Sequence, residues 1–431
     1  MDINDFIIRQ LNILLLNGSN YDDLSKMFPK FQYDLNKPFD EIINEIVDDI
    51  KKETAKYLNE ININDIKYTD GISTCIYLPY EDSGYKLTFM AGIDSNKDDI
   101  SEETLFDVAS ITKMFTLLLT FKMIEYGYFN LDDKISSLSN RFINLKDFTI
   151  EDLLRLCGDL ETKGKIQDGK DYRDSERILS TIHLLSDDRS KNKYTDYGAI
   201  VISKVIEEVY YKNTGKRLRY DEIMDRIILK PYNLGNTLFN PTTYHLAGNG
   251  NNSSLVHDPK SRALGGAVGS AGIFTTSEDL TKVAKEMFKV SDVNYDYMKN
   301  LVSKYNLLKM GTMTFPYSEQ NNRGLLGLFQ KNIDINCKWL VPLVYGHHTF
   351  TAQGFTGAVA TFDSTNKIHN NFLVNTIKKW EKAKPDNYLS NFKHYQYYIV
   401  GKTMELYMLR EYEKMFRGNV TNIDKVYKID K

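Results

Sequence analysis

The chain has 431 residues, with 55 lysine and arginine residues against 58 aspartate and glutamate residues and a net charge of −3. This length predicts two subdomains or one large domain with an insertion, and the balanced charge argues against a nucleic-acid partner. The three cysteines, Cys75, Cys157 and Cys337, are far apart and lack CxxC spacing, which argues against a disulfide framework and against a zinc cluster. Of seven histidines only His347 and His348 are close, and neighbours on a strand point to opposite faces. No metal and no cofactor is therefore expected.

The N-terminus reads MDINDFIIRQLNILLLNG and is acidic before its short apolar run. A secretory signal needs a basic beginning and a small-residue cleavage site, and neither is evident. No segment approaches the roughly 20 apolar residues of a membrane span. We expect a cytoplasmic protein without a membrane partner.

Helical spacing of apolar residues predicts two N-terminal helices, Ile3–Leu16 and Phe39–Leu58. From Ile72 the pattern changes to two strands, Ile72–Leu78 and Tyr85–Ile93, joined by a polar turn. We therefore divide the chain into a helical extension, residues 1–65, and a larger domain, residues 66–431.

The middle of the larger domain, about residues 128–300, is mostly helical in pattern, and strands return after it. The candidate helices are Ile150–Cys157, Glu176–Ser186, Tyr197–Tyr211, Tyr220–Leu229 and Ser277–Val290 (with Ser277 as its cap), followed near the end of the chain by Asn391–Phe416. The candidate strands are Arg323–Lys331, Leu340–Tyr345, Ala358–Asp363 and Asn371–Thr376. A sheet built from both ends of the chain around a helical block predicts an α+β fold with a helical subdomain, and the cleft between the lobes is the expected ligand site.

The stretch FDVASITKMFTLLLTFKMIEYG, residues 106–127, joins a strand-like run, Thr104–Val108, to a segment that is apolar on nearly every side. Such a segment predicts a buried helix, here Ile111–Tyr126. Ser110 and Lys113 are three residues apart at its start and therefore share one face. The unpaired N–H groups and the positive dipole of a first helical turn favour negative charge on a serine oxygen or an oxyanion.

Burial and the positive helix end are expected to make Lys113 neutral, and a neutral lysine can take the proton of Ser110 to create a nucleophile. The bare pattern S-x-x-K is weak. It occurs five times, beginning at Ser83, Ser110, Ser190, Ser364 and Ser390. Only Ser110 joins a strand to a buried helix. The alternative is that Ser110 is merely an N-cap serine.

Three further segments carry candidate site residues. Tyr194 precedes a helix in KYTDYGAIVISKVIEEV and could act as a general base if cations lower its pKa, or it could simply pack. In TAQGFTGAVATFD, Gly354 and Gly357 permit close backbone approach beside a strand, or form an ordinary hairpin. The glycine-rich segment 255–280 is predicted to be a loop that closes the helical lobe, without a role in the chemistry.

The order of these segments resembles the penicillin-recognising serine hydrolases, and within them the class C β-lactamase and esterase branch. FDVASITKMFT is similar to the helix that carries the nucleophile, YTDYGAIVISKVIEEV to the Tyr-x-Asn segment, and GFTGAVATFD to the strand after the third motif. The resemblance covers roughly residues 72–376. It implies the β-lactamase/DD-peptidase fold, an antiparallel sheet flanked by helices with a helical subdomain.

Two positions depart from the pattern of that family. Asp196 stands where the family has asparagine, so a group that donates and accepts becomes an acceptor that could hold the Lys113 ammonium. The third motif, usually Lys-Thr-Gly or His-Thr-Gly, reads Ala352-Gln353-Gly354 and lacks the cation. A β-lactam carboxylate is normally met near that cation, so β-lactam hydrolysis is the less expected activity.

The resemblance implies a serine hydrolase or acyl-transfer enzyme that works through an acyl-enzyme on Ser110. Lys113 would activate Ser110, and Tyr194 would relay the proton to the leaving group and activate the incoming water or alcohol. The residues expected at the oxyanion hole or the substrate are Asp196, Gln353, Gly354 and Phe355, with the N–H groups of Ser110 and Phe355 as oxyanion donors.

The expected partner is a small-molecule ester or amide. An esterase-like substrate is the first expectation, followed by acyl transfer or a peptidase acting on D-residues. The competing hypothesis is a catalytically impaired relative that serves as a binding or scaffold module. The oligomeric state is left open.

Overall fold

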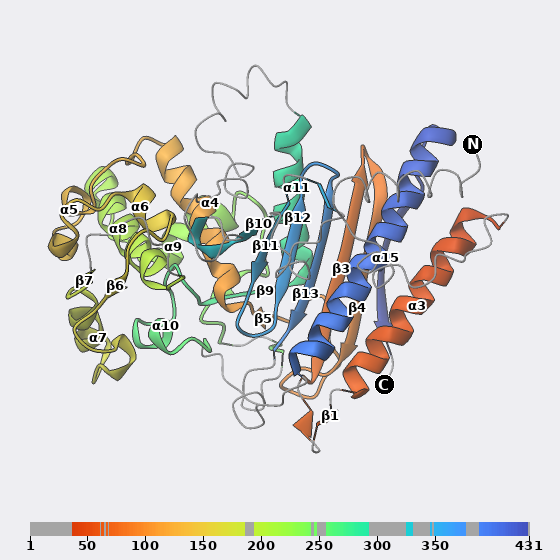
Figure 1. The fold of residues 1–431 in the computed structure, drawn as a ribbon, viewed down its shortest axis with the longest axis horizontal. Helices are drawn as coiled ribbons and strands as arrows, with labels where there is room; N and C mark the ends of the chain where they lie inside the picture. Colours follow the sequence, from red (N-terminus) through yellow and green to blue (C-terminus); the bar gives the residue numbers. More distant parts are fainter. Residues whose placement is uncertain are drawn as a thin grey trace.

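The computed structural model describes residues 37–60, 62–63, 66–67, 69–185, 194–242, 245–247, 256–292, 325–330, 345–346, 349–375 and 388–429. Within these residues a seven-stranded sheet is covered by helices on both faces, and a helical lobe lies beside it (Figure 1). This arrangement is the predicted α+β fold with a helical subdomain.

The central sheet has the strand order β10-β11-β12-β13-β3-β4-β14. Its strands are β3 (Gly71–Tyr80), β4 (Ser83–Gly92), β10 (Phe329–Gln330), β11 (Thr349–Gln353), β12 (Val359–Asp363), β13 (Ile368–Val374) and β14 (Asn422–Ile429). All neighbouring pairs are antiparallel except β14, which runs parallel to β4. Because β3 pairs with β13, the two ends of the chain build one sheet around the helical block, as the sequence predicts.

One face of the sheet is covered by α3 (Phe39–Glu60) and α15 (Tyr388–Phe416), which lie side by side in Figure 1. Ile42, Ile46 and Ile50 of α3 are fully buried in a core shared with the sheet strands and α15. Their spacing is the helical period that the sequence shows. Residues 1–36 of the predicted extension lie outside the described part, and the domain boundary stays a prediction.

A buried hydrogen bond ties β4 to α15: the Tyr85 hydroxyl donates to Glu413 Oε2 at 2.6 Å. Glu413 also accepts from the main-chain N–H and hydroxyl of Thr421. Burial and the hydrogen bond with Glu413 raise the pKa of Tyr85, so the hydroxyl stays a donor. We expect Tyr85→Phe to lower the free energy of unfolding by about 1–3 kcal/mol, because a buried carboxylate loses one of its donors.

Urea unfolding measures this loss, and Tyr211→Phe is the control because Tyr211 is 42% exposed. Equal stability of the Tyr85 and Tyr211 variants would show that the bond to Glu413 contributes nothing.

The other face of the sheet packs against α11 (Ser277–Asp292), and α4 (Thr112–Glu125) enters the helical lobe from there. The remaining helical elements of the lobe are α5 (Ile135–Leu138), the 3₁₀ helix Asn140–Leu145, α6 (Ile150–Leu154), the 3₁₀ turn Ile166–Asp168, α7 (Tyr172–Leu179), α8 (Tyr197–Thr214), α9 (Tyr220–Met224), a π turn (Asp225–Leu229) and α10 (Pro259–Ala263). Short strands complete it: β5 (Phe106–Asp107), β6 (Leu160–Glu161), β7 (His183–Leu184), β8 (Leu238–Phe239) and β9 (Ile273–Thr275).

Several predicted bounds are wrong for local reasons. The helix predicted over Ile150–Cys157 ends at Leu154, because Leu156 adopts a positive φ of 56°. The helix predicted from Glu176 begins at Tyr172, where Asp171 caps it through the N–H of Asp174.

The cap of α11 is also different from the prediction. The Thr276 hydroxyl, rather than Ser277, accepts the N–H of Asp279, and the Ser277 hydroxyl instead bonds to Ser73. The glycine-rich segment 255–280, predicted to be only a loop, contains α10 and β9.

The sequence analysis does not predict two strands of the central sheet, β11 and β14. β14 carries exposed charged residues because it lies at an edge of the sheet, and it therefore shows little of the apolar alternation of a half-buried strand. β11 was predicted only as part of a glycine turn, although it pairs with both β10 and β12. The helix predicted over Ile3–Leu16 and most of the strand predicted over Leu340–Tyr345 lie outside the described residues.

Candidate active site

Ser110 lies in a single 3₁₀ turn, Ala109–Ile111, between β5 and α4. Ala109 has a positive φ of 44°, a region that non-glycine residues rarely occupy and that is held only by surrounding structure. Here the buried Asp107 carboxylate supplies that support. It accepts the N–H of Ala109 at 2.8 Å and both the main-chain N–H and Nδ1 of His257, at 2.8 and 2.7 Å. Asp107 thus links the turn that carries Ser110 to His257, a residue far from it in the sequence.

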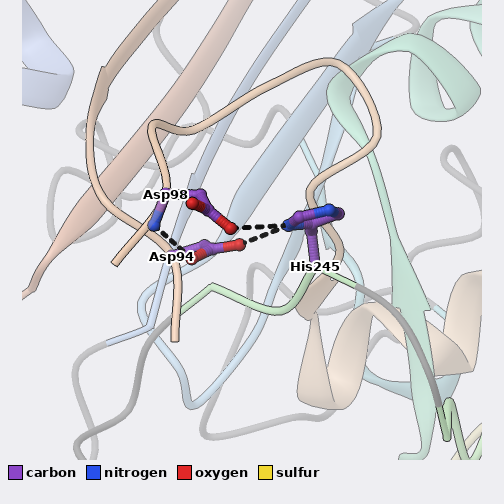
Figure 2. Close-up of side chains that lie close together, drawn as sticks. All are labelled: Asp94, Asp98 and His245. Carbon is purple, nitrogen blue, oxygen red and sulfur yellow. Dashed lines mark hydrogen bonds and ion pairs between the residues drawn. The ribbon is translucent and has the colours of Figure 1, made fainter. Parts of the chain in front are cut away.

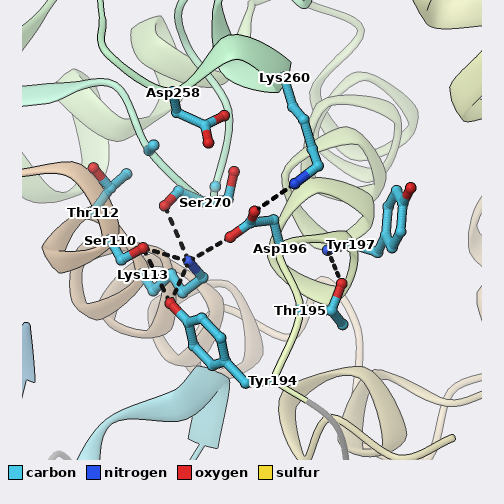
Figure 3. A network of polar contacts seen from close by, with 12 residues as sticks. Ser110, Thr112, Lys113, Tyr194, Thr195, Asp196, Tyr197, Asp258, Lys260 and Ser270 are labelled. Atoms are coloured by element: carbon cyan, nitrogen blue, oxygen red, sulfur yellow. Dashed lines mark hydrogen bonds and ion pairs between the residues drawn. The ribbon is translucent and has the colours of Figure 1, made fainter. Parts of the chain in front are cut away.

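The Ser110 hydroxyl does not cap the helix. Neither the 3₁₀ turn nor α4 has a side-chain cap hydrogen bond, and Ser110 Oγ instead accepts from Lys113 Nζ at 2.8 Å and from the Tyr194 hydroxyl at 3.1 Å (Figure 3). The alternative prediction that Ser110 is merely an N-cap is therefore wrong.

Lys113 is buried, as predicted, with 1% of its side chain exposed. Its Nζ lies 2.8 Å from Ser110 Oγ, 3.0 Å from the Tyr194 hydroxyl, 2.9 Å from Asp196 Oδ1 and 3.3 Å from the main-chain oxygen of Ser270. An ammonium has three protons and no acceptor, so this ring of oxygens fits the charged lysine. The structure brings the three predicted catalytic residues and Asp196 together.

The predicted neutral state of Lys113 is wrong for this arrangement. Burial lowers the pKa of Lys113, but the interactions with Tyr194 and Asp196 outweigh burial, and the pKa lies above its ordinary value. For Asp196, burial raises the pKa, but Lys113 and Lys260 outweigh it and hold the pKa far below its usual range. The two groups therefore form a charged pair, and the helix end is not the deciding influence on Lys113.

Lys260, on α10, also belongs to this network, and the sequence analysis does not single it out. Its Nζ lies 2.9 Å from Asp196 Oδ2, so one carboxylate bridges two lysines. A sequence signal for its helix existed: Asp258 caps the turn by accepting the N–H of Ser261 at 2.7 Å, and Pro259 occupies the first helical position. Nothing in that signal indicates that the turn lies against Asp196.

We expect Asp196→Asn to lower the free energy of unfolding at pH 7 by about 1.5–3 kcal/mol, because two ammonium groups lose a charged acceptor. The folded-state pKa of Asp196 is depressed, so its contribution is fully present above the ordinary aspartate pKa of about 3.9 and declines as the pH falls below it. The difference between wild type and variant should therefore shrink at pH 3. Urea unfolding at both pH values measures it.

The control is Asp147→Asn, which breaks an exposed ion pair in which Lys134 Nζ lies 2.8 Å from Asp147 Oδ1. This change should lower the free energy of unfolding by less than about 1 kcal/mol. A constant difference between pH 7 and pH 3 for Asp196→Asn would contradict the assigned charge pair.

The turn after β11 lies against the turn that carries Ser110. A Cβ at Gly354 would clash with the main-chain oxygen of Val108, so this approach requires glycine. The N–H of Gly354 donates to the oxygen of Ala358 at 2.7 Å and closes the hairpin to β12. Gln353 ends β11, and Phe355, in the turn, is 64% exposed. The segment is both a hairpin and a neighbour of the Ser110 turn, and a donor role for the Phe355 N–H stays a prediction.

One group of metal-ligand type occurs among the described residues: donor atoms of Asp94, Asp98 and His245 lie within 4.8 Å of one another (Figure 2). The Asp94 carboxylate is 2.7 Å from His245 Nδ1 and accepts the N–H groups of Asn96 and Asp98. The hydrogen bond with Asp94 raises the pKa of His245. These hydrogen bonds explain why the three side chains lie together without a metal ion. The group shares no residue with the Ser110 network.

None of the helices in the described part combines the length and the apolarity of a membrane-spanning segment.

Comparison with known proteins places the chain in a family. The sequence pattern of the Beta-lactamase family matches residues 84–391. "Beta-lactamase-like protein 4" of Dictyostelium discoideum is 25% identical over 276 residues, which cover 56% of this chain and 48% of that protein. The chain thus spans about half the length of this curated relative.

Two solved structures of SurE, one of them with D-Leu, have the same fold. Each has a TM-score of 0.56 and 17% identity, and the alignments cover 78% and 79% of this chain and 74% of SurE. The family pattern reaches from the start of β4 across the Ser110 turn and both lobes. The chain therefore belongs to the beta-lactamase family.

Proposed function

We propose that the protein is a serine hydrolase that forms an acyl-enzyme at Ser110 and acts on a small ester or amide, with esterase-like substrates first. One observation carries the proposal. Ser110 Oγ lies 2.8 Å from Lys113 Nζ and 3.1 Å from the Tyr194 hydroxyl, on a strained turn where it makes no cap. A nucleophile within hydrogen-bond reach of a proton acceptor that a third group orients is the arrangement that activates serine.

The charged state of Lys113 changes the roles expected for the lysine and the tyrosine. Asp196 holds Lys113 as an ammonium, so Lys113 is not available to take the Ser110 proton directly. In the proposed acylation Ser110 Oγ bonds to the substrate carbonyl carbon as its proton passes to the Tyr194 oxygen. Tyr194 gives its own proton to the leaving-group oxygen, whose bond to the carbonyl carbon breaks. Lys113 stabilises the negative charge that develops on the tyrosine and serine oxygens.

Deacylation runs through the same groups in reverse. Water or an alcohol attacks the acyl carbon, its proton passes to Tyr194, and Tyr194 returns a proton to Ser110 Oγ as the acyl bond breaks. The N–H groups of Ser110 and Phe355 are the proposed donors to the carbonyl oxygen, because the β11–β12 turn lies against the Ser110 turn. Gln353 and Gly354 would line the substrate beside them.

The substrate class follows from what the site offers. The third motif, Ala352-Gln353-Gly354, has no cation, so a β-lactam carboxylate lacks the partner that the family normally provides. Esters and amides that need no such cation are therefore favoured, and peptides with D-residues or acyl transfer are the next candidates. A cytoplasmic location is part of the same proposal.

The competing function is a non-catalytic binding module, which the two altered motifs favour. The two functions are separated by incubating the protein with a neutral alkyl fluorophosphonate and with a fluorescent penicillin, followed by intact mass and peptide mapping. One phosphonyl adduct on Ser110, with weak or no penicillin adduct, is expected. Asp196→Asn restores the amide donor and should raise any penicillin reaction. A folded protein that neither probe labels would instead support the binding module.

A further inference from the structure

The position of Lys260 is fixed by its short helix. α10 is capped by Asp258, and the hydroxyl of Ser261 donates to the main-chain oxygen of Ala271 at 2.9 Å, which ties the helix to the segment that leads into β9. From this helix the Lys260 side chain points toward Asp196, and Figure 3 shows Ser110, Lys113, Asp196 and Lys260 in one chain of contacts.

The Lys260 ammonium has capacity for a ligand. Within the described part of the chain its hydrogen-bond acceptor is Asp196 Oδ2, at 2.9 Å, and the ammonium lies 6.0 Å above the centre of the Tyr197 ring. An ammonium has three N–H donors, and 28% of the side chain is exposed. Burial lowers the pKa of Lys260, but Asp196 outweighs it and raises the pKa, so the group carries its charge.

The nearby carboxylates do not use all three N–H donors of Lys260. Asp196 is shared between Lys113 and Lys260, so each of its two oxygens already accepts from one ammonium. Asp258 is the other acidic group that acts on Lys260, and burial together with Asp196 raises the pKa of Asp258. Asp258 Oδ1 is also engaged by the N–H of Ser261. A substrate anion could therefore complete the coordination of Lys260.

Lys260 supplies a cationic donor, which the altered second and third motifs lack. Asp196 cannot donate to a substrate oxygen while it is ionised, and the third motif has no cation. Lys260 lies on the far side of Asp196 from Lys113, and so on the far side from Ser110 as well. We propose that Lys260 binds a carboxylate on the acyl part of the substrate and makes the enzyme select esters or amides of dicarboxylic acids. This rests on the proposed function of Ser110.

The test compares two chromogenic esters of matched length, mono-(4-nitrophenyl) glutarate and 4-nitrophenyl valerate. The ratio of their kcat/KM values reports selection for the carboxylate. We expect wild type to favour the anionic ester by about 10- to 100-fold, the range of a hydrogen bond to a charged group. Lys260→Gln should bring the ratio near one through the KM of the anionic ester, and Lys260→Arg should restore most of it.

Lys134→Gln is the control, because Lys134 is an exposed lysine paired with Asp147 and should leave the ratio unchanged. If Lys260→Gln does not fold, Lys260→Met, which keeps the apolar stem of the side chain and removes its charged donors, reports the same ratio.

Different results would refute the carboxylate site at Lys260 and the proposed nucleophile Ser110. If neither ester is turned over and the neutral fluorophosphonate does not label Ser110, the proposed function fails. If both esters are hydrolysed with a ratio near one in wild type, or if Lys260→Gln lowers kcat/KM equally for both, then Lys260 only neutralises Asp196 and the carboxylate site is refuted.

Discussion

Replacement of Ser110 by alanine is expected to abolish acylation and leave the fold intact. The Ser110 oxygen makes no cap bond, so α4 loses nothing at its start. Lys113 keeps Asp196 and the main-chain oxygen of Ser270 as acceptors. The free energy of unfolding should therefore fall by only about 1 kcal/mol, the contribution of one hydrogen bond. Loss of a catalytic serine lowers kcat by on the order of 10⁶, so ester turnover should fall to the background rate.

Fluorophosphonate labelling followed by peptide mapping measures the effect, together with urea unfolding. Ser83→Ala is the matched control, because Ser83 begins another S-x-x-K pattern but donates to the main-chain oxygen of Tyr80 at 2.9 Å. That variant should be labelled at the wild-type rate. An adduct that persists in Ser110→Ala on a different serine would refute Ser110 as the nucleophile.

Lys113→Met and Tyr194→Phe are expected to slow acylation strongly and to behave as one unit. A residue that transfers a proton in the transition state typically contributes about 10²–10⁴-fold. Lys113 Nζ lies 3.0 Å from the Tyr194 hydroxyl, and both lie within 3.1 Å of Ser110 Oγ. If Tyr194 carries the proton and Lys113 stabilises the charge on Tyr194, removal of either residue disables the other. The double variant should therefore lose far less than the product of the two single losses.

Single-turnover acylation with 4-nitrophenyl valerate measures these rates, and thermal unfolding separates them from folding defects. Tyr194→Phe keeps the ring, so its melting temperature should change little. Lys113→Met leaves Asp196 with Lys260 as its remaining ammonium partner and should be the less stable variant. Tyr126→Phe, at a tyrosine that is 53% exposed, is the control. Single losses that multiply in the double variant, or full activity of Tyr194→Phe, would contradict the relay.

The local sequence determined the elements that carry the nucleophile. Residues 111–126 are apolar on nearly every side, and all of α4 except Lys122 and Glu125 is buried. The spacing of three residues predicted that Ser110 and Lys113 share a helix face. They do lie side by side, although Ser110 is in the 3₁₀ turn that precedes α4. The return of strands after the helical block predicted a sheet built from both chain ends, which the pairing of β3 with β13 confirms. Such features depend on periodicity and near neighbours, so the sequence reveals them directly.

Only the tertiary structure decided the charges of the site. Asp196 and Lys260 are far from Lys113 along the chain, and yet their side chains form one line of ion pairs of 2.9 Å. In a poorly solvated interior the pKa of a lysine depends on which charges surround it, and a close carboxylate outweighs both burial and a helix dipole. The sequence contained Lys260 in a glycine-rich segment without any sign of its partner. Burial of a helix follows from its own pattern of residues, whereas the protonation state of Lys113 follows from long-range contacts that the fold creates.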